Sequence, residues 1–537
     1  MDDYPRHNEA VSRHYENFDE PLAIQRLDHY FCENILYGNS FSLASRVKMI
    51  SRSCLLDLKE VLRVLGGERT RWFVLAMVAT VILFAQASRT GLRTDPIVYA
   101  GIARTMADSG DYLNLKVGDE PYYFKPPLGF WLAALAIKVL GPTPLAVTLF
   151  SRLFGLGGVF LTAWLGARLY GARIGWVAGL ALATTHLFMA TSVTFRLDST
   201  MMFGILLSFC AYFSKKKWGP PVFYLGITIA VLAKGPPGLL PLIVAPLHTY
   251  FYGDRSTWSK NIFRWLSWSP LLLLPLSWWI YLIWNEGTRP LNMIYHELFR
   301  TRGGITSSFA SFWKIYFFEF SKLYWPWLPF AWIGAWTASR SLWNFEMDRQ
   351  ARGAGAFVLM WIALVLAACA VKKAQYLRYI ILALPAISIL SAKAVVEIGR
   401  EKIFDWLPGS VAVLAFTAVI SLACFPPAPA SSQSAEYLAM AQILDRRLPH
   451  TSPVSLLKLR PKRGKEQVEL TRPEKGIGIF FFNRPIKLIS VTEAQENSKT
   501  ERVTLLIRKS EARRIREKMP IELLFAGNLH AVAEVVR

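Results

Sequence analysis

The chain has 537 residues, of which 53% are apolar and 14% are aromatic, and its mean hydropathy is +0.29. Together with recurring long apolar runs, this composition excludes an ordinary soluble enzyme and indicates a polytopic membrane protein. The net charge of +23 is better explained by basic loops between spans than by nucleic-acid binding, so we expect no nucleic-acid partner.

The apolar runs begin after a polar, mixed-charge segment, 1–70, which we expect to be a cytoplasmic extension without a cleavable signal peptide. Runs of about 15–25 residues then predict eleven spans within 71–425. These spans are expected near 72–89, 146–166, 174–193, 199–213, 219–233, 236–252, 264–284, 322–338, 355–371, 377–395 and 406–425. A shorter run at 126–140 is either a twelfth span or an interfacial segment. The predicted fold class is mainly α, a polytopic transmembrane helical bundle of about 11–13 spans.

Basic residues set the expected orientation of these spans. Lys and Arg crowd before the first span and in every second loop, including the run 215–217. The positive-inside rule therefore places the N-terminus in the cytoplasm. An odd number of spans leaves 426–537 on the external side, together with the loop 90–145.

The segment 426–537 follows a Pro-rich linker and is expected to be a small soluble α/β domain. Apolar runs predict strands at 478–482 and 503–507, and polar amphipathic stretches predict helices at 435–447 and 511–518. The segment has twenty basic residues against twelve acidic ones. This excess would steer an anionic acceptor, or it is simply a solvated surface.

Several basic residues remain on the external side, where the positive-inside rule does not explain them. Cations fixed there need an anion, and a phosphate at the external leaflet is the natural candidate. The residues are Lys125, Arg196, Lys234, Lys372, Lys373 and Arg378. Pro126 and Pro127 stiffen the backbone after Lys125, and glycines and prolines after Lys234 expose amides suited to anions. The alternatives are a snorkelling Lys234 and an aromatic interfacial anchor at 372–379.

Two acidic residues accompany these cations on the same face. Asp95 stands in Arg-Thr-Asp-Pro just after the first span, and Asp198 stands in the turn Thr-Phe-Arg-Leu-Asp-Ser. Each is either a helix cap or a carboxylate available for proton transfer, and together they make a two-carboxylate site plausible. His296, in a later external loop, is either structural or a metal or substrate contact.

Seven short motifs in this order resemble one known family. They are Asp95, Tyr-Ala-x-Ile-Ala-Arg-x-Met (99–106), Ser-Gly-Asp-Tyr (109–112), Pro-Tyr-Tyr-Phe-Lys-Pro-Pro-Leu (121–128), Asp198, Ala-Lys-Gly-Pro (233–236), and Tyr-Leu-Arg-Tyr (376–379) before Leu384-Pro385. Over roughly 72–425 the chain resembles the bacterial lipid-linked-sugar glycosyltransferases of the GT-C superfamily. The nearest branches are the 4-amino-4-deoxy-L-arabinose lipid A transferases and the protein mannosyltransferases.

This resemblance implies a multi-pass enzyme of the bacterial inner membrane with its C-terminal domain in the periplasm. It would move a sugar from a polyprenyl-phosphate carrier to lipid A or another envelope glycolipid. Asp95 would be the catalytic carboxylate, with Asp198 as a second carboxylate. The phosphate contacts that the resemblance implies are Lys125, Lys234 and Arg378, and the external cations Lys372 and Lys373 are further candidates from the sequence itself. We expect the substrates to be lined by Tyr99, Tyr123, Pro126, Pro127, Arg196, Tyr376 and Tyr379.

One position departs from the family pattern. The residue before Lys-Pro-Pro is often acidic, and in the aminoarabinose branch it looks like a metal contact, whereas here it is Phe124. Phe124 cannot coordinate a metal, which counts against aminoarabinose as the sugar. No nucleotide is expected, because the chain has no Walker or Gly-rich dinucleotide signature, and a divalent metal held with His296 stays open. Other functions in view are a protein O-mannosyltransferase-like enzyme and a lipid-linked-sugar flippase, although transporters place polar groups at mid-membrane rather than at one face.

Overall fold

The computed structural model describes thirteen stretches of the chain, all of them within the compact unit Leu65–Arg537. They are 68–85, 91–92, 94–214, 216–253, 263–292, 295, 309–371, 376–399, 433–449, 452–458, 472–500, 503–527 and 530–535. The predicted extension 1–70 lies almost wholly outside these residues, as does the predicted span at 406–425. The same is true of the candidate residues His296, Lys372 and Lys373.

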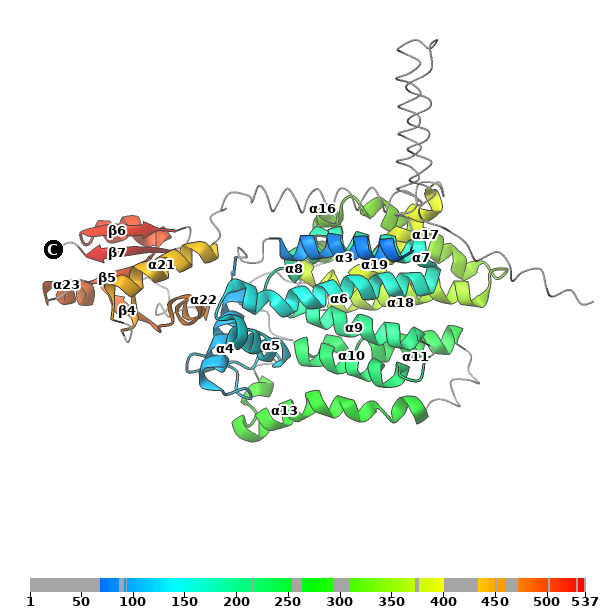
Figure 1. Cartoon of the computed structure of the whole chain (residues 1–537), viewed down its shortest axis with the longest axis horizontal. Coiled ribbons are helices and arrows are strands. Elements are labelled where there is room, and N and C mark those ends of the chain that lie inside the picture. The colour runs from blue at the N-terminus through cyan, green and yellow to red at the C-terminus, as the bar shows by residue number, and fades with distance from the viewer. Residues whose placement is uncertain are drawn as a thin grey trace, which may run out of the picture. The chain divides into compact units, whose positions relative to one another are not determined.

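The first part of the described chain is a bundle of helices (Figure 1). Its α-helices are α3 (Glu68–Phe84), α4 (Asp95–Ser109), α5 (Leu128–Leu140), α6 (Pro144–Tyr170), α7 (Ala172–Thr184), α8 (His186–Ser192), α9 (Asp198–Phe213), α10 (Gly219–Lys234), α11 (Pro241–Tyr252), α13 (Leu273–Glu286), α15 (Phe309–Trp313), α16 (Phe320–Tyr324), α17 (Leu328–Trp343), α18 (Arg349–Val371) and α19 (Leu384–Ile398). Tighter or wider turns join some of them: η2 (Pro236–Leu239), η3 (Ser269–Leu272), η4 (Lys314–Glu319) and η5 (Leu377–Leu382). The bundle agrees with the predicted mainly α fold.

Helix length bears on the predicted spans. Among the described residues, three helices are long and apolar enough to cross a membrane alone: Pro144–Tyr170, Phe263–Glu286 and Arg349–Ala370. The second of them runs through η3 and α13. The pair α7 and α8, bent by 66° at Thr185, would make a fourth. Three shorter apolar helices, α5, α9 and α10, have 13, 16 and 16 residues. The predicted number of spans therefore stays a prediction.

Small residues let the bundle helices approach closely. A Cβ added to Gly175 of α7 would lie 2.3 Å from the Ala163 carbonyl oxygen of α6, so only hydrogen fits between these helices. Elsewhere the core is aromatic. The ring of Phe209 lies 4.7 Å from that of Trp361 and 5.0 Å from that of Phe357, and all three side chains are fully buried. The helices α3 and α19 each contact α6 and α7, and Figure 1 shows these helices running side by side.

The C-terminal part is a mixed sheet with helices. Its elements are α21 (Gln433–Arg447), β3 (Val454–Lys458), α22 (Arg472–Ile477), η6 (Gly478–Phe482), β4 (Ile486–Ser490), α23 (Val491–Thr500), β5 (Thr504–Arg508), η7 (Lys509–Glu511), α24 (Ala512–Arg516), β6 (Ile521–Ala526) and β7 (His530–Val535). The strand order is β4-β3-β5-β7-β6. β3 is parallel to β4 and β5, whereas β7 is antiparallel to β5 and β6. Leu456 pairs with both Leu488 and Leu506, which fixes the register of the parallel half.

One predicted strand of this part is wrong. The run 478–482 forms the π-helical turn η6, while β5, α21 and α24 lie on the predicted strand and helices. Gly478, Phe480, Phe481 and Phe482 are buried and Ile479 is half-buried, so most of the run is covered. A short run that is apolar all round has no alternation, and periodicity cannot separate a strand from a buried helical turn.

Candidate functional site

Asp95 is the first residue of α4, and Pro96 follows it in the first turn. Proline suits this position because the first helical N–H groups have no partner within the helix. The Asp95 carboxylate lies 3.4 Å from Nη1 of Arg378, and its side chain is 46% exposed. Asp95 is therefore an accessible carboxylate that one cation orients.

The second carboxylate is buried. Asp198 begins α9 and Lys234 ends α10, and Nζ of Lys234 donates to Oδ1 of Asp198 at 2.5 Å. The two side chains are 5% and 14% exposed. A negative side chain at a helix N-terminus and a positive one at a helix C-terminus also interact favourably with the two helix dipoles. The ends meet because α9 and α10 pack closely: a Cβ on Gly226 would lie 2.5 Å from the Gly204 carbonyl oxygen.

Arg378 joins the two acid–cation pairs into one cluster. Its guanidinium interacts electrostatically with both Asp198 and Asp95. It also lies over the ring of Tyr376 at 4.8 Å, and over that of Tyr379 at 6.0 Å. Lys234 lies 5.7 Å from the same Tyr379 ring. The tyrosines predicted at 376 and 379 therefore hold the two cations that face the carboxylates.

The Lys-Pro-Pro segment closes on this cluster from another side. Lys125 interacts electrostatically with Lys234. Gly235 has a φ of +90°, and a Cβ built there would lie 4.0 Å from Pro126 Cγ. Two lysines held close together repel one another, so a bound anion would lower the free energy of this arrangement.

The turn before Asp198 is fixed against the same segment. A Cβ on Gly129, just after Pro127 and Leu128, would overlap Leu197 at 2.2 Å. Ser151 of α6 donates to the Arg196 carbonyl oxygen at 3.0 Å, while the charge of Arg196 acts on Asp198. These contacts bring four motifs that are distant in sequence to one end of the bundle.

An aromatic layer supports α4 at this point. The ring of Tyr99 meets those of Phe130, Phe195 and Tyr122 edge-on, at 5.4, 5.8 and 6.3 Å. Edge-to-face contacts of this kind stabilise aromatic clusters. Burial, with the neighbouring Tyr122 and Asp95, raises the pKa of the Tyr99 phenol well above its ordinary value. Tyr99 is therefore neutral at physiological pH and shapes the site beside Asp95.

Tyr123 faces another way. Successive residues of an extended segment point to opposite sides, and here Tyr122 joins the aromatic layer. Tyr123 is buried, and burial together with the Glu286 carboxylate raises its pKa to about 12. Its described neighbours are therefore at the end of α13. That Tyr123 lines the substrate stays a prediction.

The described residues do not fit a metal ion. Among the parts of the chain that the structure describes, no three His, Cys, Asp or Glu side chains come together. Phe124 offers no ligand beside Lys125, and the carboxylates of Asp95 and Asp198 each have a cationic partner. The one predicted ligand, His296, lies outside the described residues.

Arg152 is a residue that the sequence reasoning missed. It lies within an apolar span of α6 and is 1% exposed. Its Nε donates to Thr148 Oγ1 at 3.0 Å, Nη2 donates to the Val193 carbonyl oxygen at 2.8 Å, and Nη1 donates to the Leu83 carbonyl oxygen. Arg152 thus satisfies carbonyls at the ends of α3 and α8. Arg152 could have been recognised from the sequence as a single arginine inside an apolar run.

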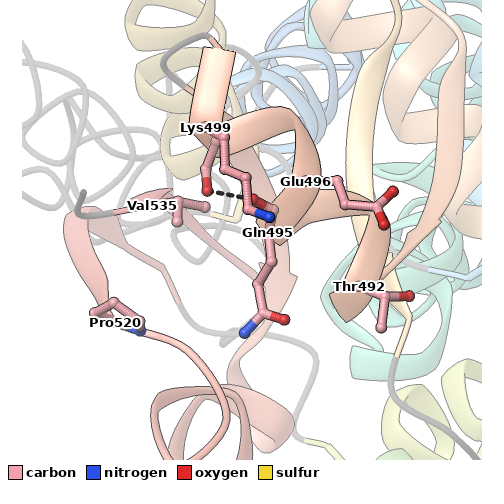
Figure 2. A pocket seen from close by; sticks show the side chains of 7 residues that line it. Thr492, Gln495, Glu496, Lys499, Pro520 and Val535 are labelled. Atoms are coloured by element: carbon pink, nitrogen blue, oxygen red, sulfur yellow. Dashed lines mark hydrogen bonds between the residues drawn. The ribbon is translucent and has the colours of Figure 1, made fainter.

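A groove on the C-terminal part lies apart from this cluster. It has a volume of about 740 Å³ and is lined by one face of α23, with Pro520 and Val535 opposite (Figure 2). Glu496 and Lys499 give it mixed charge, and Ser498 Oγ donates within α23 to the Gln495 carbonyl oxygen at 2.7 Å. None of the predicted site residues lines this groove.

Parts of the chain match a known family and a known transferase. Residues 124–289 match the family described as dolichyl-phosphate-mannose-protein mannosyltransferase. An undecaprenyl phosphate-alpha-4-amino-4-deoxy-L-arabinose arabinosyl transferase of Shewanella sediminis is 23% identical over 361 residues, which cover 61% of this chain and 60% of the relative. The matched stretch thus spans less than two thirds of that relative.

Solved structures add the fold. ArnT from Cupriavidus metallidurans in the apo state has a TM-score of 0.62 at 15% identity, over 88% of this chain and 99% of that one. The same protein bound to undecaprenyl phosphate has a TM-score of 0.62 at 16% identity, over 87% and 98%. The resemblance drawn from the sequence is confirmed: the chain is similar to GT-C glycosyltransferases, and among them to the aminoarabinose lipid A transferases.

Proposed function

We propose that this chain is an integral membrane glycosyltransferase that moves a sugar from a polyprenyl-phosphate carrier to an envelope acceptor. The acceptor is lipid A or another glycolipid on the periplasmic side. The observation that carries this proposal is one cluster in which Asp95 and Asp198 face Arg378 and Lys234, with Lys125 close by. A similar fold that has been solved with undecaprenyl phosphate supports the choice of donor.

The cations would act on the leaving group. When the bond between the anomeric carbon and the phosphate oxygen breaks, negative charge grows on the phosphate. Lys125, Lys234 and Arg378 are held in place by backbone stiffness, an ion pair and aromatic contacts, so they need little reorganisation to meet that charge. Loss of one such preorganised donor costs about 2.7–4 kcal/mol in the barrier.

Asp95 rather than Asp198 would be the base. The Asp95 side chain is 46% exposed and its ion pair is 3.4 Å long, whereas Asp198 is 5% exposed and lies 2.5 Å from its lysine. Asp95 would take the proton of the acceptor hydroxyl while that oxygen bonds to the anomeric carbon from the face opposite the phosphate. Asp198 would fix Lys234 and balance its charge.

The topology belongs to the same proposal. It places the segment 1–70 in the cytoplasm, 71–425 in the membrane and 426–537 in the periplasm as a soluble domain. The basic loops support this orientation because cytoplasmic loops carry the excess of Lys and Arg. The site and the C-terminal elements would then share one side of the inner membrane.

A protein acceptor is the second candidate. The family description matched at 124–289 names a protein mannosyltransferase, and that stretch includes Lys125, Asp198 and Lys234. A flippase is less well supported because the paired charges lie at helix ends, such as those of α9 and α10, rather than within broken helices at mid-membrane.

Mass spectrometry of envelope lipids tests the proposal. Cells with the wild-type chain should contain a glycolipid with one additional sugar, and cells lacking the chain or carrying Asp95→Asn should lose it. Asp108→Asn is the matched control, since Asp108 lies on the same helix with its side chain 60% exposed and pairs only with Arg104 among the described residues. Wild-type amounts of the sugar in Asp95→Asn cells would remove Asp95 from catalysis. The same additional mass found on proteins would favour the second candidate.

A further inference from the structure

The C-terminal elements pack directly on the helix that begins with Asp95. A Cβ on Gly476 of α22 would lie 2.6 Å from the Ile97 carbonyl oxygen of α4, and one on Gly101 would lie 3.0 Å from Gly476 Cα. Arg104 Nη1 donates to the Phe480 carbonyl oxygen at 2.8 Å. The position of α22 relative to the candidate site is therefore set by backbone contact.

This packing places Arg472, the first residue of α22, against the Lys-Pro-Pro segment. The Arg472 guanidinium lies 4.6 Å from the ring centre of Phe124 and 5.9 Å from that of Tyr122. Phe124 directly precedes Lys125, and Tyr122 contacts Tyr99 in the aromatic layer. Arg472 is thus a cation held by two rings at the edge of the site.

No carboxylate neutralises Arg472 within the described ranges, although other arginines of the C-terminal elements have such partners. Arg484 lies 2.8 Å from Asp445, and Arg447 lies 3.0 Å from Glu534. The nearest acid in sequence, Glu474, accepts two hydrogen bonds from Arg508, at 2.6 and 3.0 Å. Arg472 is half-buried, so its charge has lost part of its water without gaining a carboxylate partner in the described part of the chain.

We propose that Arg472 binds a phosphate group of a substrate, so that the site is completed by a residue from the C-terminal elements. A guanidinium is planar, and contact with two rings limits how it can turn, which suits two parallel bonds to a phosphate. The phosphate is either that of the carrier lipid or one on the acceptor. This inference rests on the proposed function and adds a residue to it.

Binding to the purified full-length chain in nanodiscs tests the inference. The probes are undecaprenyl phosphate and bis-phosphorylated lipid A, each measured by microscale thermophoresis. Arg472→Ala should weaken binding of one probe by about tenfold to a hundredfold, as expected for a lost charged hydrogen bond. Arg472→Lys should lose less affinity for that probe, because lysine keeps the positive charge but lacks the planar guanidinium that forms two parallel hydrogen bonds. The control Arg513→Ala removes a side chain that is 96% exposed, and it should change neither Kd.

The two arms distinguish the sources of the phosphate. A selective loss of undecaprenyl phosphate binding assigns Arg472 to the carrier, and a selective loss of lipid A binding assigns it to the acceptor. Both Kd values within twofold of wild type would overturn the inference. That outcome leaves the proposed function standing if Asp95→Asn still abolishes transfer, and transfer by Asp95→Asn would count against the function whatever Arg472 does.

Discussion

The Lys234 ammonium lies 2.5 Å from the Asp198 carboxylate, and the two residues end and begin neighbouring helices with both side chains largely buried. Removal of one partner from a buried ion pair costs about 3–5 kcal/mol, because the other charge stays buried without compensation. We therefore expect Lys234→Met and Asp198→Leu each to lower the unfolding temperature in detergent. The double variant should recover much of that loss and still be inactive. A loss in the double variant that equals the sum of the two single losses would show that the pair is not coupled.

Arg378 should resist conservative replacement. Its guanidinium reaches Asp95 at 3.4 Å while stacking on Tyr376, and a lysine ammonium has no planar face or fork to do both. We expect Arg378→Lys to lower the transfer rate by about a hundredfold to a thousandfold, which is the loss typical of one preorganised donor. Initial rates at saturating donor and acceptor check this expectation. A change confined to KM would instead indicate ground-state binding.

Gly476 should not tolerate a side chain. A methyl group there would lie 2.6 Å from the Ile97 carbonyl oxygen, and overpacking of this kind typically costs about 1–3 kcal/mol. We expect Gly476→Ala to increase proteolysis between the bundle and the C-terminal elements, as limited trypsin digestion would detect. Gly91→Ala is the control, because no described residue lies within 4 Å of the position its Cβ would take. Equal digestion of the two variants would contradict the close contact.

Asp111 should give a measurable pH dependence. Burial opposes its ionisation, yet hydrogen bonds from Asn114 and the Lys116 ammonium at 3.3 Å hold the pKa of this carboxyl below its ordinary value of 3.8. A carboxyl with a lowered folded-state pKa stabilises the fold above pH 3.8, and that contribution is lost as the pH falls below this value. The difference in unfolding temperature between wild type and Asp111→Asn should be present at pH 7 and shrink toward pH 3. A difference that grows with acid would reverse the sign.

Much of the candidate site could be predicted from the sequence because its residues break local rules. Helix ends can be predicted from the sequence, and they locate these residues. Prolines or Gly-Pro follow Asp95, Lys125 and Lys234, and each stands near the start or end of a helix. The pairing could not be predicted, since either acid was free to meet any of the cations. Only the packing of α9 on α10 decides that Asp198 takes Lys234 and leaves Asp95 for Arg378.

Contacts between distant parts of the chain could not be predicted from the sequence either. Nothing around Arg472 marks it, because its role depends on a backbone contact between Gly476 and α4. Likewise, the buried run 478–482 has the composition of a strand and forms a π-helical turn instead. The roles of Lys372, Lys373 and His296 stay predictions, since these residues lie outside the described parts.

The glycine contact between α4 and α22 restricts how this protein can be recombined. At this contact backbone packs on backbone, so no side chain there can adjust to a different partner. A C-terminal part taken from a relative would therefore not fit against α4. Chimeras should therefore exchange α4 and the residues from α21 onward as one inseparable cassette, even though most of the membrane bundle lies between them in the chain.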